Sequence, residues 1–415
     1  MGEITGLITN GTAAFPGVIR WNSRGLITDI EPLAALPEDA PAVMAGKFNA
    51  HSHPEQSIYT GLVDKNWDLG TWCRHTIYRY STAMTPRRVR LACLHAFAGM
   101  LLCGTASVMV SYYLHGRAGN RLDREVIAAA RSVGIRLVFG RMYYDLTDPL
   151  ASPAKLESQR FYYESPDEAE QNLRSLMSLE DDSTMICPAL HSFHASSPEA
   201  IIRGIRLGAE LNRPVQLHLS EDRGDVERCL KEHGCRPVEY LVQLQNSGEI
   251  PPLSGVILSD CCWLNDRERA LIAENGMRVV LNPRMNARVK TGFPDVAALT
   301  AAGIPLWCGT DGEASNDSLD VEDERTFLKK RLAGTVPDSV IDSFGCQKFA
   351  FGAGWIGRLG TGAWADLRVY RRGRLSDVYV GGRLTVRDGK LVHLDRERDI
   401  EIPLKAEAAA MTAQI

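Results

Sequence analysis

The feature that most constrains the fold is a series of eight short apolar segments in the middle of the chain, each of a length that suits one β-strand. Helical stretches follow most of them, and Ser165, Ser197 and Asn265 each stand as a capping side chain before proline or an acidic first turn. The apolar segments are 47–51, 105–110, 135–140, 185–190, 214–219, 255–259, 278–282 and 304–308. Nearly continuous apolar strands that alternate with helices predict a parallel sheet covered on its outer face.

The positions of the polar residues distinguish two parallel-sheet folds. Eight strands can close into a (β/α)8 TIM barrel, and an open doubly wound sheet is the alternative. Unusual polar side chains stand at or just past the C-terminal ends of the segments: His51, His53, His191, His218, Glu221, Asp260, Asn282 and Asp311. A barrel gathers these ends at one mouth, whereas an open sheet spreads them along an edge by about 4.8 Å per strand. The sequence therefore predicts an α/β fold with a closed barrel.

The two ends of the chain resemble each other and differ from the middle. Residues 4–33 and 365–402 are short alternating segments broken by glycine, including Gly-Gly and Asp-Gly hairpin turns. We expect both termini to build one small β-sandwich domain, from residues 1–45 and 355–415, beside a barrel domain at 46–354. The chain length of 415 residues suits this division, because a barrel takes about 250 residues.

Composition and charge bear on the class of partner. The 47 basic and 51 acidic side chains give a net charge of −4, and no basic stripe stands out. We therefore expect a small-molecule substrate, with no nucleic-acid or membrane partner, and a homodimer or higher homo-oligomer. The ten cysteines include no C-x-x-C pair, and no apolar run approaches the length of a membrane span. These features lead us to expect a cytoplasmic location with reduced thiols.

Three histidines and one aspartate form a candidate metal site. His51 and His53 are two residues apart, so on a strand their side chains point to the same side. His218 ends the fifth apolar segment and Asp311 follows the eighth, which places both at the same rim. Three neutral nitrogens and one carboxylate suit Zn²⁺, and Fe²⁺ is chemically close. The sequence thus predicts one divalent metal per chain.

Several segments at these strand ends resemble the amidohydrolase superfamily, in the branch that contains cytosine, guanine and S-adenosylhomocysteine deaminases and atrazine chlorohydrolase. The segments are 48–53 (FNAHSH), 188–192 (PALHS), 214–221 (PVQLHLSE), 282–286 (NPRMN), 309–316 (GTDGEASN) and 360–367 (GTGAWADL). The resemblance implies a barrel whose metal is held by His51, His53, His218 and Asp311. It also implies a deaminase, in which water activated by the metal attacks a C=N or amidine carbon of a small molecule and ammonia is released.

The resemblance also implies roles for other residues. Glu221 matches the proton shuttle between the attacking water and the leaving nitrogen, and Asp311 accepts a proton as well as binding metal. His191 matches a substrate-orienting histidine, and we predict further substrate contacts at Gln56 and Asn282. The lesser pocket candidates are Trp72, Tyr112, Tyr113, His115, Arg141, Arg284 and Glu313. We expect His194 to serve packing or the surface.

Asp260 departs from the family pattern, in which a histidine ends the sixth strand and donates to developing negative charge. An ionised aspartate would repel that charge. Asp260 and Glu221 can share a proton, which makes one of them an acid. Alternatively, ionised Asp260 pairs with a cationic amidinium or guanidinium of the substrate, which is the outcome we favour from sequence. A third alternative is that the chain has lost its hydrolytic activity.

Alternative functions follow from the same residues. An acyclic formimino or guanidino hydrolase is one, with Arg141 or Arg284 holding a substrate carboxylate. A chlorohydrolase is another, and a metal-binding pseudoenzyme is an alternative of a different class. A dinuclear amidohydrolase is disfavoured, because residues 190–192 (LHS) offer no lysine at the end of the fourth strand.

Overall fold

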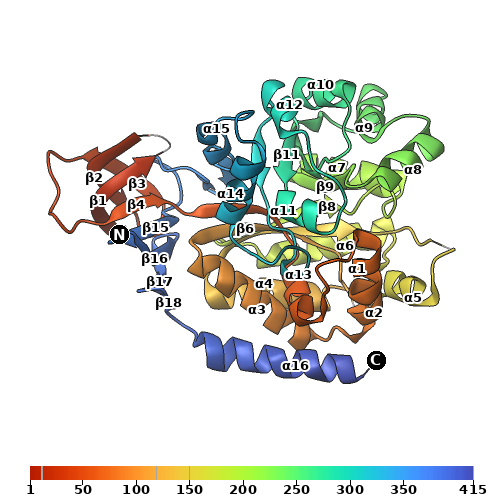
Figure 1. The fold of residues 1–415 in the computed structure, drawn as a ribbon, viewed down its shortest axis with the longest axis horizontal. Helices are drawn as coiled ribbons and strands as arrows, with labels where there is room; N and C mark the ends of the chain where they lie inside the picture. Colours follow the sequence, from red (N-terminus) through yellow and green to blue (C-terminus); the bar gives the residue numbers. More distant parts are fainter. Residues whose placement is uncertain (11–12, 118, 149, 415) are drawn as a thin grey trace.

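The computed structural model describes residues 1–10, 13–117, 119–148 and 150–414. Its centre is a sheet of eight parallel strands in sequential order (Figure 1). These strands are β5 (Lys47–Ser52), β6 (Thr105–Tyr112), β7 (Arg136–Tyr143), β8 (Thr184–Leu190), β9 (Val215–Leu219), β10 (Val256–Asp260), β11 (Arg278–Leu281) and β12 (Leu306–Cys308). Ser52 and Asp311 form a parallel bridge that brings the first strand beside the end of the last. The predicted barrel and all eight of its strands are confirmed.

Helices follow the strands and cover the barrel. The longer ones are α3 (Pro86–Leu102), α4 (Arg121–Val133), α5 (Pro153–Tyr162), α6 (Pro166–Leu176), α7 (Pro198–Leu211), α8 (Arg223–His233), α9 (Pro237–Asn246), α10 (Asp266–Glu274) and α14 (Val321–Arg331). Ser165, Ser197 and Asn265 cap α6, α7 and α10 through their side-chain oxygens, as predicted. A capped first turn satisfies backbone N–H groups that the helix itself leaves unpaired.

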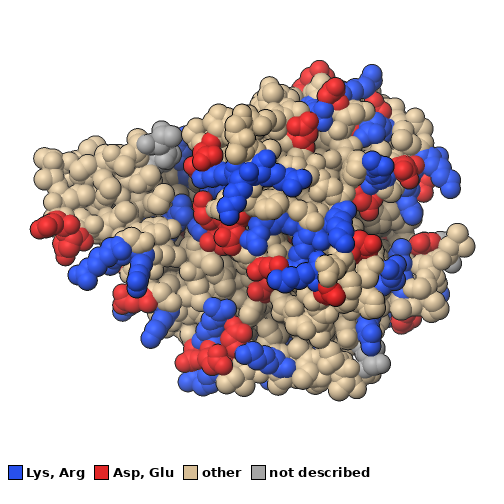
Figure 2. All heavy atoms as spheres, in the orientation of Figure 1, with Lys and Arg blue, Asp and Glu red and all other residues tan. Residues whose placement is uncertain are grey.

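Short helices occupy the loops that follow the strands. They are η1 (Pro54–Leu62), α1 (Leu69–His75), α2 (Ile77–Tyr80), α11 (Pro283–Arg288), α12 (Val296–Ala301), α13 (Glu313–Asn316) and α15 (Asp338–Asp342). No helix in the described ranges is both long and apolar enough to cross a membrane. Acidic and basic side chains are interspersed on the face of the molecule drawn in Figure 2.

Both termini build a second sheet beside the barrel. Its strands are β1 (Gly2–Asn10), β2 (Ala13–Trp21), β3 (Ile27–Pro32), β4 (Ala42–Ala45), β15 (Leu367–Arg371), β16 (Arg374–Val380), β17 (Arg383–Arg387) and β18 (Lys390–Leu391). The two ends of the chain join where β4 and β15 pair in antiparallel fashion, with Leu367 opposite Ala45. A small domain composed from both termini is therefore present, and the domain boundaries at 45/46 and 354/355 stay a prediction.

The C-terminal helix α16 (Ile402–Ala413) lies along the barrel helix α3, away from the terminal sheet (Figure 1). Glu407 pairs with Arg87 and Arg88 of α3 at 2.8 and 3.2 Å. Leu404 and Met411, seven residues apart on one side of α16, are buried. These contacts attach the last helix to the barrel, although the sequence grouped residues 355–415 with the terminal domain.

A buried ion pair joins the barrel to the terminal sheet. Arg136, the first residue of β7, donates to both carboxylate oxygens of Asp366 at 2.7 and 2.8 Å. The guanidinium lies over the ring of Trp364 at 4.3 Å, and Asp366 also accepts the backbone N–H of Gly381 at 2.6 Å. Removing one partner of such a pair leaves a buried charge uncompensated, and this lowers the free energy of unfolding.

We predict that Asp366→Asn lowers the free energy of unfolding by about 3–5 kcal/mol, because Arg136 keeps its buried charge and loses its counterion. The measurement is urea unfolding of the metal-loaded protein. Arg24 and Asp182 also join the two units, and their side chains are 55% and 49% exposed. In the control Asp182→Asn we expect a loss below about 1 kcal/mol. Equal losses in the two variants would refute this account of the interface.

Candidate metal centre and cavity

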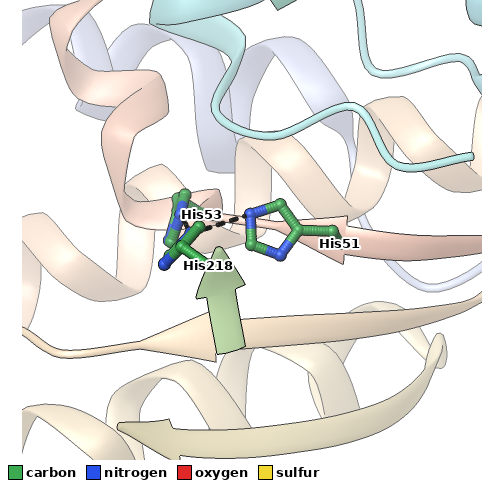
Figure 3. Close-up of side chains that lie close together, drawn as sticks. All are labelled: His51, His53 and His218. Atoms are coloured by element: carbon green, nitrogen blue, oxygen red, sulfur yellow. Dashed lines mark hydrogen bonds between the residues drawn. The ribbon is translucent and has the colours of Figure 1, made fainter. Parts of the chain in front are cut away.

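Three histidine side chains converge at the C-terminal mouth of the barrel. His51 lies on β5, His53 follows directly after that strand, and His218 lies on β9. The Nε2 atom of His218 lies 3.2 Å from that of His51 and 3.3 Å from that of His53. Figure 3 shows the three rings turned toward one another, and their ligand nitrogens all lie within 4.8 Å of each other.

The opposite nitrogen of each ring is fixed by an acceptor. His53 Nδ1 lies 2.6 Å from the carbonyl oxygen of Ser111, and His218 Nδ1 lies 2.8 Å from that of His191. A carbonyl only accepts, so each Nδ1 carries the proton and each Nε2 carries a lone pair. His51 Nδ1 donates to Gln216 Oε1 at 2.8 Å, and the Gln216 amide is oriented by its own donation to Ala50 O.

The three Nε2 lone pairs therefore face one another with no proton to share. Burial lowers the pKa of His53 to about 3, with the neighbouring charge of His218 acting in the same direction. Burial also lowers the pKa of His51 well below its usual value. Neutral imidazoles fixed through Nδ1 are the form in which histidine binds metal ions.

Asp311 completes a set of four donors. Its Oδ1 lies 3.7 Å from His53 Nε2, and its backbone N–H donates to the carbonyl of His51 at 3.1 Å. Three imidazole nitrogens and one carboxylate oxygen are a donor set that suits a catalytic divalent cation. The residues present thus fit the metal that the sequence predicts.

Positive backbone φ angles mark the strand ends around this site. Ser220 after β9, Asp260 at the end of β10 and Asp311 after β12 have φ of 52°, 76° and 56°. A residue other than glycine in this region costs on the order of 1 kcal/mol or more, and such strain concentrates at functional sites. Here the strained positions carry two of the carboxylates and immediately precede Glu221.

Glu221 and Asp260 are two further carboxyl groups of the site. Burial raises the pKa of Glu221 well above its usual value, and the nearby charge of Asp260 adds to this. Asp260 is fully buried, and its Oδ1 accepts from the amides of Asn282 and Asn286 at 2.9 and 3.1 Å. Its Oδ2 makes no hydrogen bond within the described chain. Burial raises the pKa of Asp260 although His218 opposes the shift.

A cavity of about 260 Å³ opens directly onto these groups. His53, His218, Asp311 and Glu221 lie in its wall. Much of the remaining wall is aromatic, from Trp72, Tyr78, Tyr113, Tyr144 and Tyr162. Aromatic walls with a few convergent polar groups are typical of small-molecule sites.

The structure places the predicted substrate residues in different surroundings. Gln56 and His191 line the cavity, as do the lesser candidates Trp72 and Tyr113. Asn282, predicted to contact substrate, lies outside the cavity lining, because its amide is engaged by Ser259 Oγ and Asp260 Oδ1. The Asn282 amide holds Asp260, and a contact of Asn282 with substrate stays a prediction.

The other lesser candidates have partners elsewhere. Arg141 is buried and donates to both oxygens of Glu164 at 2.6 and 2.9 Å. Arg284 pairs with Asp323 at 3.3 Å. Tyr112 lies in the hydrophobic core, His115 contacts Asp123, and Glu313 contacts His95. None of these five residues belongs to the described lining of the cavity.

Sequence reasoning missed several cavity residues. Tyr144 follows β7, so the rule that strand ends carry the site could have found it. Tyr78 and Tyr162 reach the cavity from α2 and α5, within long loops whose course the sequence did not indicate. His194, expected at the surface or in packing, also lines the cavity.

Comparison with known proteins identifies the family of this chain. A sequence model of the amidohydrolase family matches residues 42–382. The chain belongs to the amidohydrolase family. Its members' metal dependence agrees with the three-histidine cluster at the barrel mouth.

Similar amidohydrolases include two named deaminases. The chain is 28% identical over 388 residues to a 5-methylthioadenosine/S-adenosylhomocysteine deaminase of Syntrophobacter fumaroxidans, covering 90% of this chain and 81% of the relative. It is 26% identical over 389 residues to a 5'-deoxyadenosine deaminase of Methanopyrus kandleri, covering 86% and 84%.

Solved structures share the fold. An adenosine deaminase from Xanthomonas campestris with bound zinc is 23% identical and has a TM-score of 0.78, with 99% of this chain and 98% of that chain covered. Atrazine chlorohydrolase from Arthrobacter aurescens is 17% identical, with a TM-score of 0.80 and coverage of 99% and 100%.

We predict that Gln216→Leu weakens zinc affinity by about 10- to 100-fold, because His51 loses the acceptor that fixes its Nδ1 proton and its ring orientation. Competition with a chromogenic chelator measures the affinity. Gln171→Leu, at an exposed position of α6, is the matched control and should bind zinc as the unmodified protein does. Unchanged affinity in Gln216→Leu would contradict the role assigned to this amide.

Proposed function

We propose that this chain is a zinc-dependent deaminase, which hydrolyses an amino group from a C=N or amidine carbon of a small planar molecule and releases ammonia. The observation that carries the proposal is the convergence of three unprotonated Nε2 atoms and Asp311 beside a cavity whose wall includes His53, His218, Asp311 and Glu221. The nitrogen-rich donor set supports zinc. The bound zinc of the Xanthomonas deaminase supports it as well.

A divalent cation held by these residues would supply an activated nucleophile, because it lowers the pKa of bound water to about 7. Glu221 stands in the cavity wall, where burial and the nearby carboxylates raise its pKa well above the usual value, and its carboxyl group is placed to exchange protons with water and substrate. Its carboxylate accepts a proton from the attacking water and returns it to the leaving nitrogen. Asp311, beside the histidines, is the second proton acceptor.

The cavity lining favours a flat substrate without negative charge. Five aromatic side chains offer faces and edges to a planar ring. Glu221, Asp222 and Asp311 contribute carboxyl groups, and no lysine or arginine belongs to the described lining. A heterocyclic amine without an acidic group fits this lining better than a substrate with a phosphate, and 5-methylthioadenosine and 5'-deoxyadenosine, named among the substrates of the relatives, are amines of that kind.

The alternative of a carboxylate-bearing formimino or guanidino acid gains no support from the two arginines predicted as candidate carboxylate anchors. Arg141 and Arg284 are both paired with acidic residues outside the cavity lining. Chlorohydrolysis rests on a shared fold, which by itself does not assign a reaction. A search for chloride release from chlorotriazines separates that reaction from deamination.

For Asp260 we propose the protonated form. Both amide donors converge on Oδ1, while Oδ2 is buried and unpartnered, which is where a proton can reside. Asp260 is not part of the described cavity lining, so direct pairing with a cationic substrate, the outcome favoured from sequence, lacks support. A neutral Asp260 adds no negative charge to the site and offers an O–H donor.

The test is an ammonia-release screen of the zinc-loaded protein against purines, pterins, triazines, guanidines and formimino acids. We expect turnover of a planar heterocyclic amine, and we expect Glu221→Gln to lower kcat by about 10²- to 10⁴-fold with zinc content unchanged. Glu227→Gln, an exposed carboxylate on α8, is the control and should keep full activity. Absence of turnover across the screen, or undiminished turnover in Glu221→Gln, would contradict the proposal.

A second prediction concerns the unusual aspartate. Asp260→Asn should lower kcat by about tenfold or more, since an amide cannot exchange a proton in place of the carboxyl group. Zinc content should stay near one per chain, because Asp260 is not a ligand. Asp266→Asn, whose side chain is 99% exposed, controls for the loss of a carboxylate in this region. Unchanged turnover in Asp260→Asn would remove Asp260 from the mechanism.

A further inference from the structure

A chain of hydrogen bonds runs along the cavity wall from Asp225 to His191. Asp225 Oδ1 lies 2.7 Å from His194 Nδ1, and His194 Nδ1 lies 2.9 Å from Ser192 Oγ. Ser192 Oγ in turn lies 3.0 Å from His191 Nδ1. Both histidines line the cavity, whereas Ser192 is buried and Asp225 nearly so.

The carboxylate end sets the direction of the protons in this chain. Asp225 accepts, so the proton between it and His194 resides on His194 Nδ1. Burial alone would raise the pKa of Asp225, but the charge and hydrogen bond of His194 hold that pKa below its usual value. Since His194 Nδ1 carries a proton, it cannot accept one from Ser192.

The hydroxyl of Ser192 then has a single acceptor within the described chain, His191 Nδ1. A buried hydroxyl proton without an acceptor is unfavourable, so Ser192 donates to His191. A neutral imidazole that accepts at Nδ1 carries its proton on Nε2.

The ring of His191 is held between aromatic side chains of the cavity. Tyr113 and Tyr144 contact it edge to face, with ring centroids 5.4 and 4.9 Å away. Its Nε2 makes no hydrogen bond to the described residues, so the N–H is available to a molecule in the cavity. The ring therefore presents a donor whose direction and tautomer are both fixed.

Asp225 also contacts the backbone of the proposed proton shuttle. Its Oδ2 accepts the N–H of Glu221 at 3.2 Å, and its own N–H donates to the helix cap Asp222 at 3.0 Å. One buried carboxylate at the start of α8 thus connects two parts of the wall, the loop that carries Glu221 and the imidazole chain.

We propose that Asp225, His194 and Ser192 are positioning residues that hold His191 as the Nε2–H tautomer, so that the cavity offers a fixed donor to an acceptor atom of the substrate. A ring nitrogen or a carbonyl oxygen is such an acceptor. The proposal rests on the proposed function for its catalytic consequence. The tautomer itself is a property of the protein and can be measured without turnover.

The first test is nitrogen NMR of the zinc-loaded protein labelled with ¹⁵N-histidine, with the His191 signals assigned from their loss in His191→Asn. We expect the unmodified protein to show a protonated Nε2 and an accepting Nδ1 at His191. In Ser192→Ala we expect a mixture of tautomers or the Nδ1–H form. A His191 Nδ1–H tautomer in the unmodified protein, or identical spectra in Ser192→Ala, would overturn the proposal.

The second test is a double-mutant cycle in the deamination assay. Ser192→Ala should lower kcat about tenfold and should have no further effect in the His191→Asn background, because it acts through His191. Ser192→Thr, which keeps the hydroxyl, should recover activity, and exposed Ser178→Ala is the neutral control. Independent, additive losses from Ser192→Ala and His191→Asn would overturn the positioning role.

The two tests separate the proposals. If Ser192→Ala fails to fold, His194→Ala, at a side chain that is 38% exposed, provides the same comparison from the next member of the chain. A shifted tautomer without ammonia release from any substrate would sustain the positioning chain and refute the deaminase. Ammonia release with an unshifted tautomer would support the deaminase and refute the positioning chain.

Discussion

Three imidazole lone pairs that face one another inside a protein need a cation between them, and this requirement organises the rest of the site. The Nδ1 proton of each ring is committed to an oxygen, at Ser111, His191 and Gln216. The Nε2 atoms 3.2–3.3 Å apart therefore cannot relieve their repulsion by sharing a proton. A divalent ion converts that repulsion into coordination, which explains why the barrel tolerates such a cluster in its mouth.

The same ion accounts for the carboxyl groups around it. Glu221, Asp260 and Asp311 lie in one buried region, where burial and neighbouring carboxylates raise the pKa of Glu221 and of Asp260. A metal ion would offset part of this negative charge, and the proposed protonation of Asp260 would offset more. Ser220, Asp260 and Asp311 have positive φ angles, which cost backbone energy. The rest of the fold must therefore hold the backbone at these positions, and with it the carboxyl groups around the site.

Much of this arrangement could be predicted from sequence because it follows from periodicity. Each strand is a short apolar run, and a parallel barrel brings the ends of all strands together, so His51, His53, His218 and Asp311 had to meet. Alternation at the end of β5 put His51, on the strand, and His53, directly after it, on one side. The local sequence is enough to place a residue at a strand end, and closure of the barrel then brings the strand ends together.

The residues that sequence reasoning misplaced depend on contacts between distant segments. Asn282 stands at a strand end yet turns its amide to Asp260, and Arg141 is bound by Glu164 from the loop between α5 and α6. Tyr78 and Tyr162 reach the cavity from loops whose path follows from packing. Nothing in the sequence placed His194 in the site, because its partner Asp225 lies 31 residues away, on α8.

The most direct measurement is X-ray absorption at the zinc edge, together with elemental analysis, on protein purified and supplied with zinc. The account predicts one zinc per chain with a first shell of nitrogen and oxygen, three of its ligands being imidazoles. In His218→Ala we expect one imidazole to be lost from that shell and zinc to be bound more weakly. A shell that contains sulfur, or a protein that is fully active with neither zinc nor iron, would contradict it.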